Sequence, residues 1–269
     1  MSILVNKESK VLIQGITGTQ ASFHVKRSMD YGTNVVAGVT PGKGGSVHLD
    51  VPVFDTVREA IGETGANASV MYVPAKFVKD AVREAAEAEL DLCVCIADGV
   101  PIKDMLEIKE MLRGAKTKLI GPNTPGIITP GEARLGIFPE NIHRPGRIGV
   151  VSRSSTLTYE AVIETNRAGL GQSTVIGLGD DMLIGIDCVE TLEKFMNDPD
   201  TDAVVVIVSE ETGTISVAIG GMLKRHLAPK TLEKLLVSEL ISEPEQKNST
   251  LKTWLSGHFK TRQEQHEKK

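Results

Sequence analysis

The 269-residue sequence is poor in aromatic residues and cysteine, and it contains no long hydrophobic run. Aromatic side chains make up 4% of the residues, and every apolar stretch is shorter than the ~20 residues of a membrane-spanning helix. The net charge is −5 with both signs interspersed, so the chain lacks the basic patch of a nucleic-acid-binding surface. We therefore expect neither a membrane nor a nucleic acid as partner.

The three cysteines and six histidines show no pattern of a disulfide framework or a metal site. Cys93 and Cys95 alternate within the apolar run 92–96, so both are expected on one face of a strand, as buried thiols. Free thiols are typical of a reducing compartment, and the start of the sequence lacks the features of a signal peptide. These features predict a cytoplasmic protein without metal ligands, or a mitochondrial-matrix protein if the chain is a processed eukaryotic form.

Short apolar runs alternate with helical patterns along the chain, which indicates an α/β fold with a parallel sheet between layers of helices. Several runs are continuously apolar, as expected for strands buried on both sides. The predicted strands of a first unit are 11–14, 34–39, 68–73, 92–97 and 118–120, and its predicted helices are 21–31, 56–61, 75–88 and 102–112.

A glycine- and proline-rich stretch, 122–146, separates this unit from a second one and is interpreted as an irregular connector. The second unit has only three predicted strands, which is thin for an independent domain. Its predicted strands are 148–152, 173–178 and 203–209, and its predicted helices are 156–168, 188–196 and 214–226; a further helix, 229–240, is predicted after this unit. The expected domains are 1–122 and 147–230, joined by a connector at 123–146 and followed by a polar tail at 231–269.

The first predicted strand runs into a turn that suits a phosphate group. Gly15-Ile16-Thr17-Gly18 precedes a helical pattern, so the free N–H groups of a helix N-terminus are expected at the turn. The spacing is G-x-x-G rather than the full G-x-G-x-x-G of dinucleotide-binding folds. A tight turn that binds nothing is therefore the alternative.

A glycine-rich loop with a lysine follows the second predicted strand. Enzymes that use NAD place an acidic residue at this point, whereas this chain has Gly38-Val39-Thr40-Pro41-Gly42-Lys43-Gly44-Gly45. Lys43 offers a positive charge to a phosphate, although the spacing is not that of a Walker A loop. A ligand with an adenine end and an additional phosphate fits, and coenzyme A and NADP both qualify. A solvated lysine without a ligand is the alternative.

A hydroxyl-rich stretch, 152–160, opens a helix of the second unit. Ser155 or Thr156 is the predicted N-cap of that helix. Its N-terminus suits a phosphoryl or carboxylate group, and an ordinary capped helix is the alternative.

Taken together, residues 1–226 resemble the α subunit of succinate–CoA ligase. The matching stretches are 14–20, 38–45, 120–123, 151–154 and 156–162. The resemblance implies a Rossmann-like CoA-binding domain followed by a flavodoxin-like ligase domain that is truncated or altered. It also implies a separate ATP-grasp β subunit, in a heterodimer or heterotetramer, that binds Mg-ATP or Mg-GTP.

The resemblance assigns roles to several residues. The residues implied in CoA binding are Thr17, Gly18, Thr19, Gln20, Lys43, Ile96, Ala97 and Asp98. Tyr159 would lie in the substrate region, and the helix start at Ser154, Ser155 and Thr156 would stabilise a phosphate. Glu210 matches the acid that orients a phosphorylated histidine in the family, but the Gly-His-Ala-Gly motif that carries this histidine is missing from the sequence.

The resemblance therefore implies an acid–thiol ligase subunit that takes part in reversible, NTP-dependent formation of succinyl-CoA from a dicarboxylic acid. One alternative is a catalytically impaired paralogue or isoform that still binds CoA and the β subunit. Another is a subunit of a malate–CoA or citrate–CoA ligase.

Overall fold

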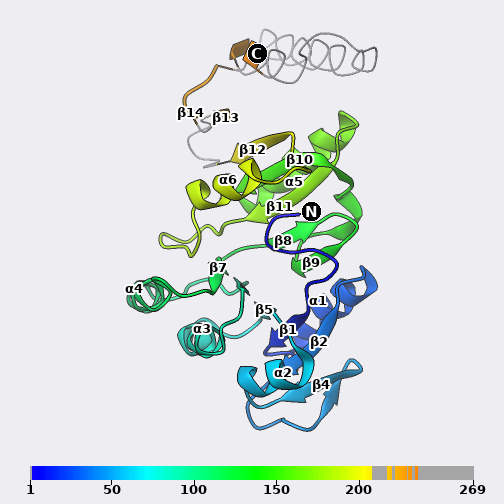
Figure 1. Cartoon of the computed structure of the whole chain (residues 1–269), viewed down its shortest axis with the longest axis vertical. Helices are drawn as coiled ribbons and strands as arrows, with labels where there is room; N and C mark the ends of the chain where they lie inside the picture. Colours follow the sequence, from blue (N-terminus) through cyan, green and yellow to red (C-terminus); the bar gives the residue numbers. More distant parts are fainter. Residues whose placement is uncertain (1, 208–216, 220–221, 229, 232–233, 236–269) are drawn as a thin grey trace, which may run out of the picture.

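The computed structural model describes residues 2–207, 217–219, 222–228, 230–231 and 234–235. Within them the chain forms two α/β units, which lie one above the other in Figure 1. The strands of the first unit are β1 (Val11–Gln14), β2 (Val35–Val39), β3 (Val47–His48), β4 (Val51–Phe54), β5 (Ala68–Met71), β6 (Leu92–Cys95) and β7 (Lys118–Ile120). Its helices are α1 (Thr19–Asp30), α2 (Val57–Thr64), the 3₁₀ turn η1 (Ala75–Phe77), α3 (Val78–Glu87) and α4 (Ile102–Met111).

The first sheet has the strand order β3-β4-β2-β1-β5-β6-β7. All neighbours pair in parallel except β3, which is antiparallel to β4. From β4 onward this is the strand order of a Rossmann-like fold. The chain first adds strands on one side of β1, up to β4, and then crosses over to add β5, β6 and β7 on the other side, so the strand order reverses between β1 and β5. The prediction of a doubly wound sheet is confirmed, and the short pair β3–β4 was not predicted.

Helices α2, α3 and α4 cover one face of this sheet. Their buried residues, such as Val57, Val82 and Ile108, share a cluster with Cys93 and Cys95 of β6. The two thiols therefore lie on one face, as predicted. Burial raises the pKa of both thiols, that of Cys95 to about 12, so they are protonated at neutral pH.

The second sheet has five strands, in the order β12-β10-β11-β8-β9. Its strands are β8 (Gly126–Thr129), β9 (Ala133–Gly136), β10 (Pro145–Ser152), β11 (Gln172–Gly177) and β12 (Ala203–Ile207); its helices are η2 (Glu140–Ile142), α5 (Ser155–Arg167) and α6 (Cys188–Met196). Strands β11, β10 and β12 pair in parallel, in the 2-1-3 order that begins a flavodoxin-like sheet.

The stretch 123–146 is not the irregular connector that was predicted. It contains β8 and β9, which form an antiparallel pair and join the second sheet through β11. Close approach of the backbones explains the glycines, because a Cβ on Gly126 would lie 2.0 Å from the carbonyl oxygen of Leu135. The second sheet is consequently wider than three strands.

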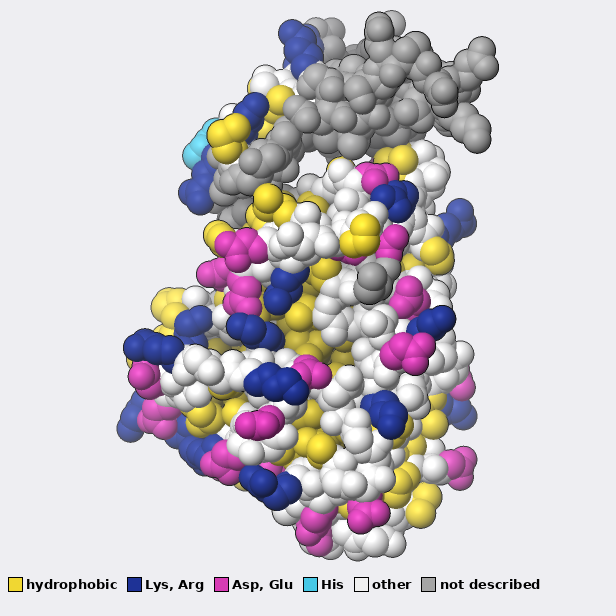
Figure 2. Space-filling model, viewed as in Figure 1, with side chains coloured by type: hydrophobic (Ala, Val, Ile, Leu, Met, Phe, Trp, Pro, Cys, Tyr) yellow, Lys and Arg dark blue, Asp and Glu magenta, His cyan; other side chains and the backbone are white. Residues whose placement is uncertain are grey.

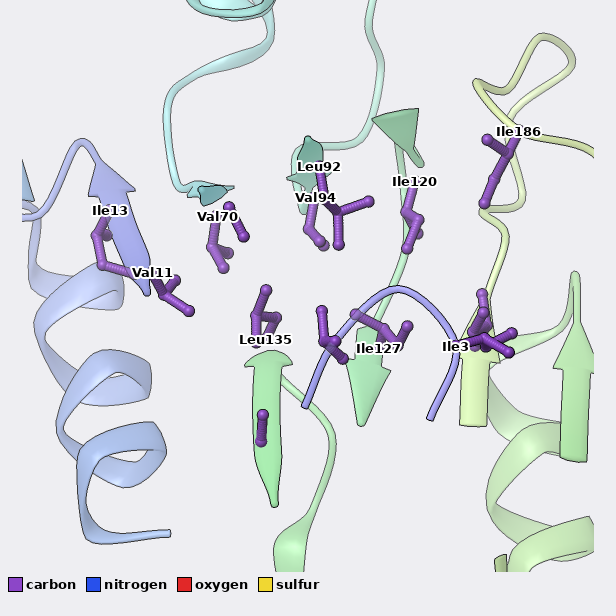
Figure 3. Packing of buried hydrophobic residues seen from close by; sticks show 14 of the residues in the cluster. Ile3, Val11, Ile13, Val70, Leu92, Val94, Ile120, Ile127, Leu135 and Ile186 are labelled. Atoms are coloured by element: carbon purple, nitrogen blue, oxygen red, sulfur yellow. The ribbon is translucent and has the colours of Figure 1, made fainter. Parts of the chain in front are cut away.

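The two units share one hydrophobic core (Figure 3). Ile127 of β8 and Leu135 of β9 face Val70 and Val94 of the first sheet, on the side opposite α2, α3 and α4. The N-terminal segment 2–10 adds Ile3 to this core. The interface between the units is therefore a packed interior.

The C-terminal part departs from the predicted helix 214–226. Strands β13 (Val217–Ile219) and β14 (Met222–Lys224) pair in antiparallel fashion there. Between them the sequence reads Gly220-Gly221, a dipeptide typical of hairpin turns that the helical interpretation overlooked. Residues 230–231 and 234–235 are helical, in line with the predicted helix 229–240, and the rest of that helix and of the tail lies outside the described residues.

Acidic and basic side chains are interspersed over the face shown in Figure 2. No helix among the described residues is long and apolar enough to cross a bilayer.

Candidate functional site

The turn after β1 leaves the N-terminus of α1 open. Gly15 adopts a positive φ of 84°, and a Cβ there would lie 2.9 Å from the carbonyl oxygen of Tyr72. Helix α1 begins at Thr19 with Gly18 as N-cap, without a capping side chain and without an acidic residue in the first turn. By contrast, a Thr56–Glu59 capping box closes the start of α2. The uncapped N–H groups and the helix dipole make the α1 turn a fitting place for an anion.

The glycine-rich loop after β2 places its lysine at this turn. Lys43 is exposed, and its Nζ donates a hydrogen bond of 3.1 Å to Thr17 Oγ1. Thr17 Oγ1 also lies 3.4 Å from Thr40 Oγ1 of the same loop. The structure thus brings Thr17, Gly18, Thr19 and Gln20 together with Lys43, although β1 and β2 are separated in the sequence by a helix.

The stretch Ile96, Ala97 and Asp98 follows β6 at the same edge of the sheet. Strand β5 lies between β1 and β6, so this stretch is two strand spacings, about 10 Å, from the end of β1. Ile96 and Ala97 are half-buried and Asp98 is exposed.

Residues after β5 fill the gap between these two stretches and were missed by the sequence analysis. Tyr72 N–H donates to Gln14 O, and Val73 Cγ1 would lie 3.2 Å from a Cβ on Gly15. Tyr72 and Val73 therefore border the turn at the position where the strand order reverses, which is where open α/β sheets bind ligands. The signal was available, because a strand was predicted at 68–73 and the ends of adjacent parallel strands meet at one edge.

The start of α5 has a different cap from the predicted one. Ser154, rather than Ser155 or Thr156, is the N-cap, and its Oγ accepts a hydrogen bond of 3.3 Å from Leu157 N. Ser154 Oγ also lies 3.2 Å from Thr156 Oγ1. The three consecutive hydroxyl residues do stand at the helix start, and Ser154, which has extended backbone, is the one that caps it.

A short chain of contacts joins this helix start to the stretch after β6. Arg153 Nε donates to Gly179 O at 3.2 Å, and Arg153 also bonds to Asp181 O. Asn123 Nδ2 donates to Asp181 Oδ1 at 3.0 Å, while Asn123 N–H donates to Ala97 O at 2.8 Å. The carboxyl edges of the two sheets therefore meet at Asn123.

Tyr159 is half-buried on α5, and burial raises the pKa of its hydroxyl. Its ring meets the buried Phe138 edge to face, with centroids 6.0 Å apart. Behind Phe138 lies Arg134, a fully buried guanidinium whose Nε donates to Phe138 O. Tyr159 thus packs on buried residues, and it lies just over one helical turn after Ser154, the N-cap of α5.

Glu210, the predicted partner of a phosphorylated histidine, lies outside the described residues. Among the residues that are described, no group of three histidine, cysteine or acidic side chains is placed to hold a metal ion.

Two family models match the chain: a CoA binding domain over residues 6–99 and a CoA-ligase domain over residues 151–250. The succinate–CoA ligase [ADP-forming] subunit alpha of Staphylococcus aureus is 53% identical over 227 residues, which cover 84% of this chain and 75% of the relative. The same subunit of Staphylococcus epidermidis is 50% identical over the same shares. This chain belongs to the succinate–CoA ligase α-subunit family.

Solved structures of low identity share the fold of this α-subunit family member. ATP citrate lyase from Methanothrix soehngenii has a TM-score of 0.68 at 20% identity, over 76% of this chain and 36% of the other. A dinucleotide-forming acetyl-coenzyme A synthetase from Candidatus Korarchaeum cryptofilum has a TM-score of 0.65 at 16% identity, over 88% of this chain and 49% of the other. The chain spans less than half the length of these two proteins.

Family membership confirms the prediction of a ligase subunit with a CoA-binding domain. The α-subunit family accounts for both units, because the first sheet carries the CoA binding domain and the second carries the CoA-ligase domain. The predicted domain boundaries and the roles of single residues stay predictions.

Proposed function

We propose that this chain binds coenzyme A at the carboxyl edge of the first sheet and takes part, with an ATP-grasp β subunit, in the reversible NTP-dependent formation of succinyl-CoA. The observation that carries the proposal is the position of Lys43 beside the uncapped N-terminus of α1, inside the segment matched by the CoA-binding family model. The relatives named for succinate support this acid over malate or citrate.

The residues at this edge fit coenzyme A. Its phosphates need hydrogen-bond donors and positive charge, which the first turn of α1 and Lys43 offer. Gly38 keeps the two loops in close contact, because a Cβ there would lie 2.4 Å from Ile16 Cγ2. The edge also lacks an acid at the end of β2, where an NAD-binding fold carries one.

We assign the roles as follows. Thr17, Gly18, Thr19, Gln20 and Lys43 hold the phosphate-bearing end of CoA, and Ile96, Ala97 and Asp98 line its path along the edge of the sheet. Coenzyme A supplies the thiol that becomes the thioester.

In the second unit, Tyr159 contacts the dicarboxylic acid. The start of α5, at Ser154, Ser155 and Thr156, stabilises phosphate through its N–H groups and hydroxyls. The β subunit, in a heterodimer or heterotetramer, binds Mg-ATP or Mg-GTP, and we place the assembly in the cytoplasm.

Replacement of Lys43 tests the CoA site directly. Lys43→Ala removes a cation from the phosphates, so CoA affinity measured by titration calorimetry is expected to fall about tenfold, the effect of one charge-assisted hydrogen bond. Lys26→Ala, which removes an exposed lysine from α1, is the matched control and is expected to bind CoA like the wild type. Equal affinities of Lys43→Ala and wild type would refute the placement of CoA.

A second candidate function is that of a subunit that binds CoA and the β subunit without carrying phosphate. The missing Gly-His-Ala-Gly motif favours it, because a relay through a histidine needs that nucleophile. Incubation of the full chain with a β subunit and γ-³²P-labelled ATP separates the two candidates. Acid-labile label on this chain supports the catalytic subunit, and its absence beside a labelled S. aureus α subunit supports the non-catalytic one.

A further inference from the structure

The glycine-rich loop and the β3–β4 hairpin form one body. Gly45 N–H donates to Val53 O, and Val53 N–H donates to Ser46 O, both at 2.9 Å. Gly44 N–H donates to Asp55 Oδ1 at 2.9 Å, and a side chain on Gly44 would collide with that carboxylate. Because the loop is closed onto β4 by its own backbone, Lys43 belongs to one hydrogen-bonded segment, 40–54. We call this segment the lysine hairpin.

Side-chain hydrogen bonds join the lysine hairpin to the first turn of α1 at two places. One is Thr17 Oγ1, which accepts from Lys43 Nζ and lies 3.4 Å from Thr40 Oγ1. The other is a bond of 2.7 Å between His48 Nε2 and Ser22 Oγ. His48 lies on β3 and Ser22 lies one turn into α1, so along the chain the bonded residues Thr17 and Ser22 flank the uncapped N-terminus.

The direction of the second bond is set by the tautomer of His48. Ser22 Oγ donates to Gly18 O at 2.9 Å, which is the carbonyl of the N-cap residue. In the Nε2–H tautomer of His48, the lone pair of Ser22 Oγ is the acceptor of the second bond. The hydrogen bonds from His48 through Ser22 therefore end at Gly18, the N-cap residue of α1.

The backbone next to His48 is held in an unusual conformation. Leu49 and Asp50 adopt φ values of 54° and 61°, a region that residues with a Cβ rarely occupy, and they connect β3 to β4 as a two-residue turn. Leu49 packs against the core shared by the two units, which fixes the turn. The turn thereby fixes His48 at the end of β3, where its ring contacts Ser22 of α1.

We propose that His48 is a positioning residue of the CoA site, which keeps Lys43 in place through its bond to Ser22. The inference rests on the proposed CoA site. When Lys43 turns its ammonium group to a phosphate, its bond to Thr17 is given up. The His48–Ser22 bond at 2.7 Å and the longer Thr17–Thr40 contact at 3.4 Å then hold the lysine hairpin against the start of α1, so loss of the shorter bond raises the freedom of Lys43 in the complex.

Titration calorimetry of the full chain with CoA tests this role. His48→Leu and Ser22→Ala are each expected to weaken CoA binding about fivefold, as for one lost hydrogen bond, and the double variant to be no weaker than either. His48→Gln, which retains an N–H donor, is expected to recover most of the affinity. Val47→Ala is the matched control, because the exposed Val47 is the other residue of β3 and its side chain points away from Ser22.

A background without Lys43 separates positioning from a general structural effect. If His48 acts through Lys43, His48→Leu has no further effect on CoA affinity in the Lys43→Ala chain. An equal fivefold loss in both backgrounds, or unchanged affinity in His48→Leu, overturns the inference while leaving the CoA site intact. A wild-type chain that does not bind CoA overturns the proposed function and this inference together.

Discussion

At the scale of single residues, a buried polar cluster lies where α1 meets the chain after β9. Arg134 is 1% exposed, and its Nη1 donates to Ser28 Oγ at 2.8 Å and to His24 O at 3.1 Å. Glu140 receives two hydrogen bonds from Arg27. Burial alone would raise the pKa of the Glu140 carboxyl, but these bonds and the nearby charges outweigh it and lower the pKa. Such a cluster is costly to break at Arg134, because this guanidinium would remain buried without its hydrogen bonds.

His143 belongs to this cluster and makes stability depend on pH. Burial lowers its pKa from 6.5 to about 4, with a further contribution from Arg134, although the bond between Nδ1 and Pro139 O opposes the shift. Between these pH values the unfolded chain binds the additional proton. The free energy of unfolding is therefore expected to fall by about 3 kcal/mol from pH 6.5 to 4 on account of His143.

Urea denaturation at a series of pH values measures this effect. His143→Gln does not titrate, so its stability is expected to fall less steeply than that of the wild type over the same range. The pKa of His24 is also lowered by burial and by Arg134, so some slope remains in the variant. Identical slopes for the two proteins would show that His143 does not contribute.

The sequence indicated the proximity of Lys43 and Thr17 but not the contact between His48 and Ser22. Lys43 and Thr17 could be paired from their glycine-rich surroundings, because such loops follow parallel strands that meet at one edge. The His48–Ser22 bond and the Arg134 cluster could not, because no motif marks these side chains as partners; separation alone does not decide it, since Lys43 and Thr17 are as far apart in the sequence as His48 and Ser22. The cap of α5 was misassigned, because Ser154, Ser155 and Thr156 have the same chemistry and only the backbone distinguishes them.

At the scale of secondary-structure elements, the pair β8–β9 depends on glycine. Gly126 has a φ of 106°, and a Cβ would lie 2.0 Å from Leu135 O. Gly126→Ala is expected to lower the free energy of unfolding by about 3 kcal/mol or more, because it combines backbone strain with a clash that side-chain rotation cannot relieve. Urea denaturation followed by far-ultraviolet circular dichroism measures the loss.

Gly114→Ala is the matched control for this change. Gly114 also has a positive φ, of 75°, but a Cβ there meets nothing within 4 Å. It is expected to cost about 1 kcal/mol, from the backbone conformation alone. Similar losses in the two variants would mean that the β8–β9 pair does not require its close approach.

Most elements of the first unit could be predicted, because continuous apolar runs of the right length alternate with helical periodicity. Strands β8 and β9 could not, since the glycines and prolines that permit their close contact are also the usual signs of a loop. The β13–β14 pair was mistaken for a helix for a related reason. Three-residue strands are too short to show the alternation that would identify them.

At the scale of the whole molecule, the core shared by the two sheets predicts that they unfold together. Val151 and Ile176 of the second sheet belong to the same cluster as Val70 and Val94 of the first. Scanning calorimetry is expected to give one transition for residues of both units, with equal calorimetric and van 't Hoff enthalpies. Leu135→Ala, in the middle of this core, is expected to cost 2 to 5 kcal/mol, roughly, without splitting the transition. Two separated transitions would contradict a common core.

The distribution of the cysteines has a practical consequence. Cys93 and Cys95 are buried between the first sheet and its helices, whereas Cys188 is half-buried at the start of α6 in the second unit. Burial raises the pKa of Cys188 as well, so a maleimide dye added to the native chain at alkaline pH is expected to attach at Cys188 and to spare the two buried thiols. The molecule thus carries a natural single attachment point, from which fluorescence can report the arrival of a second subunit without any engineered cysteine.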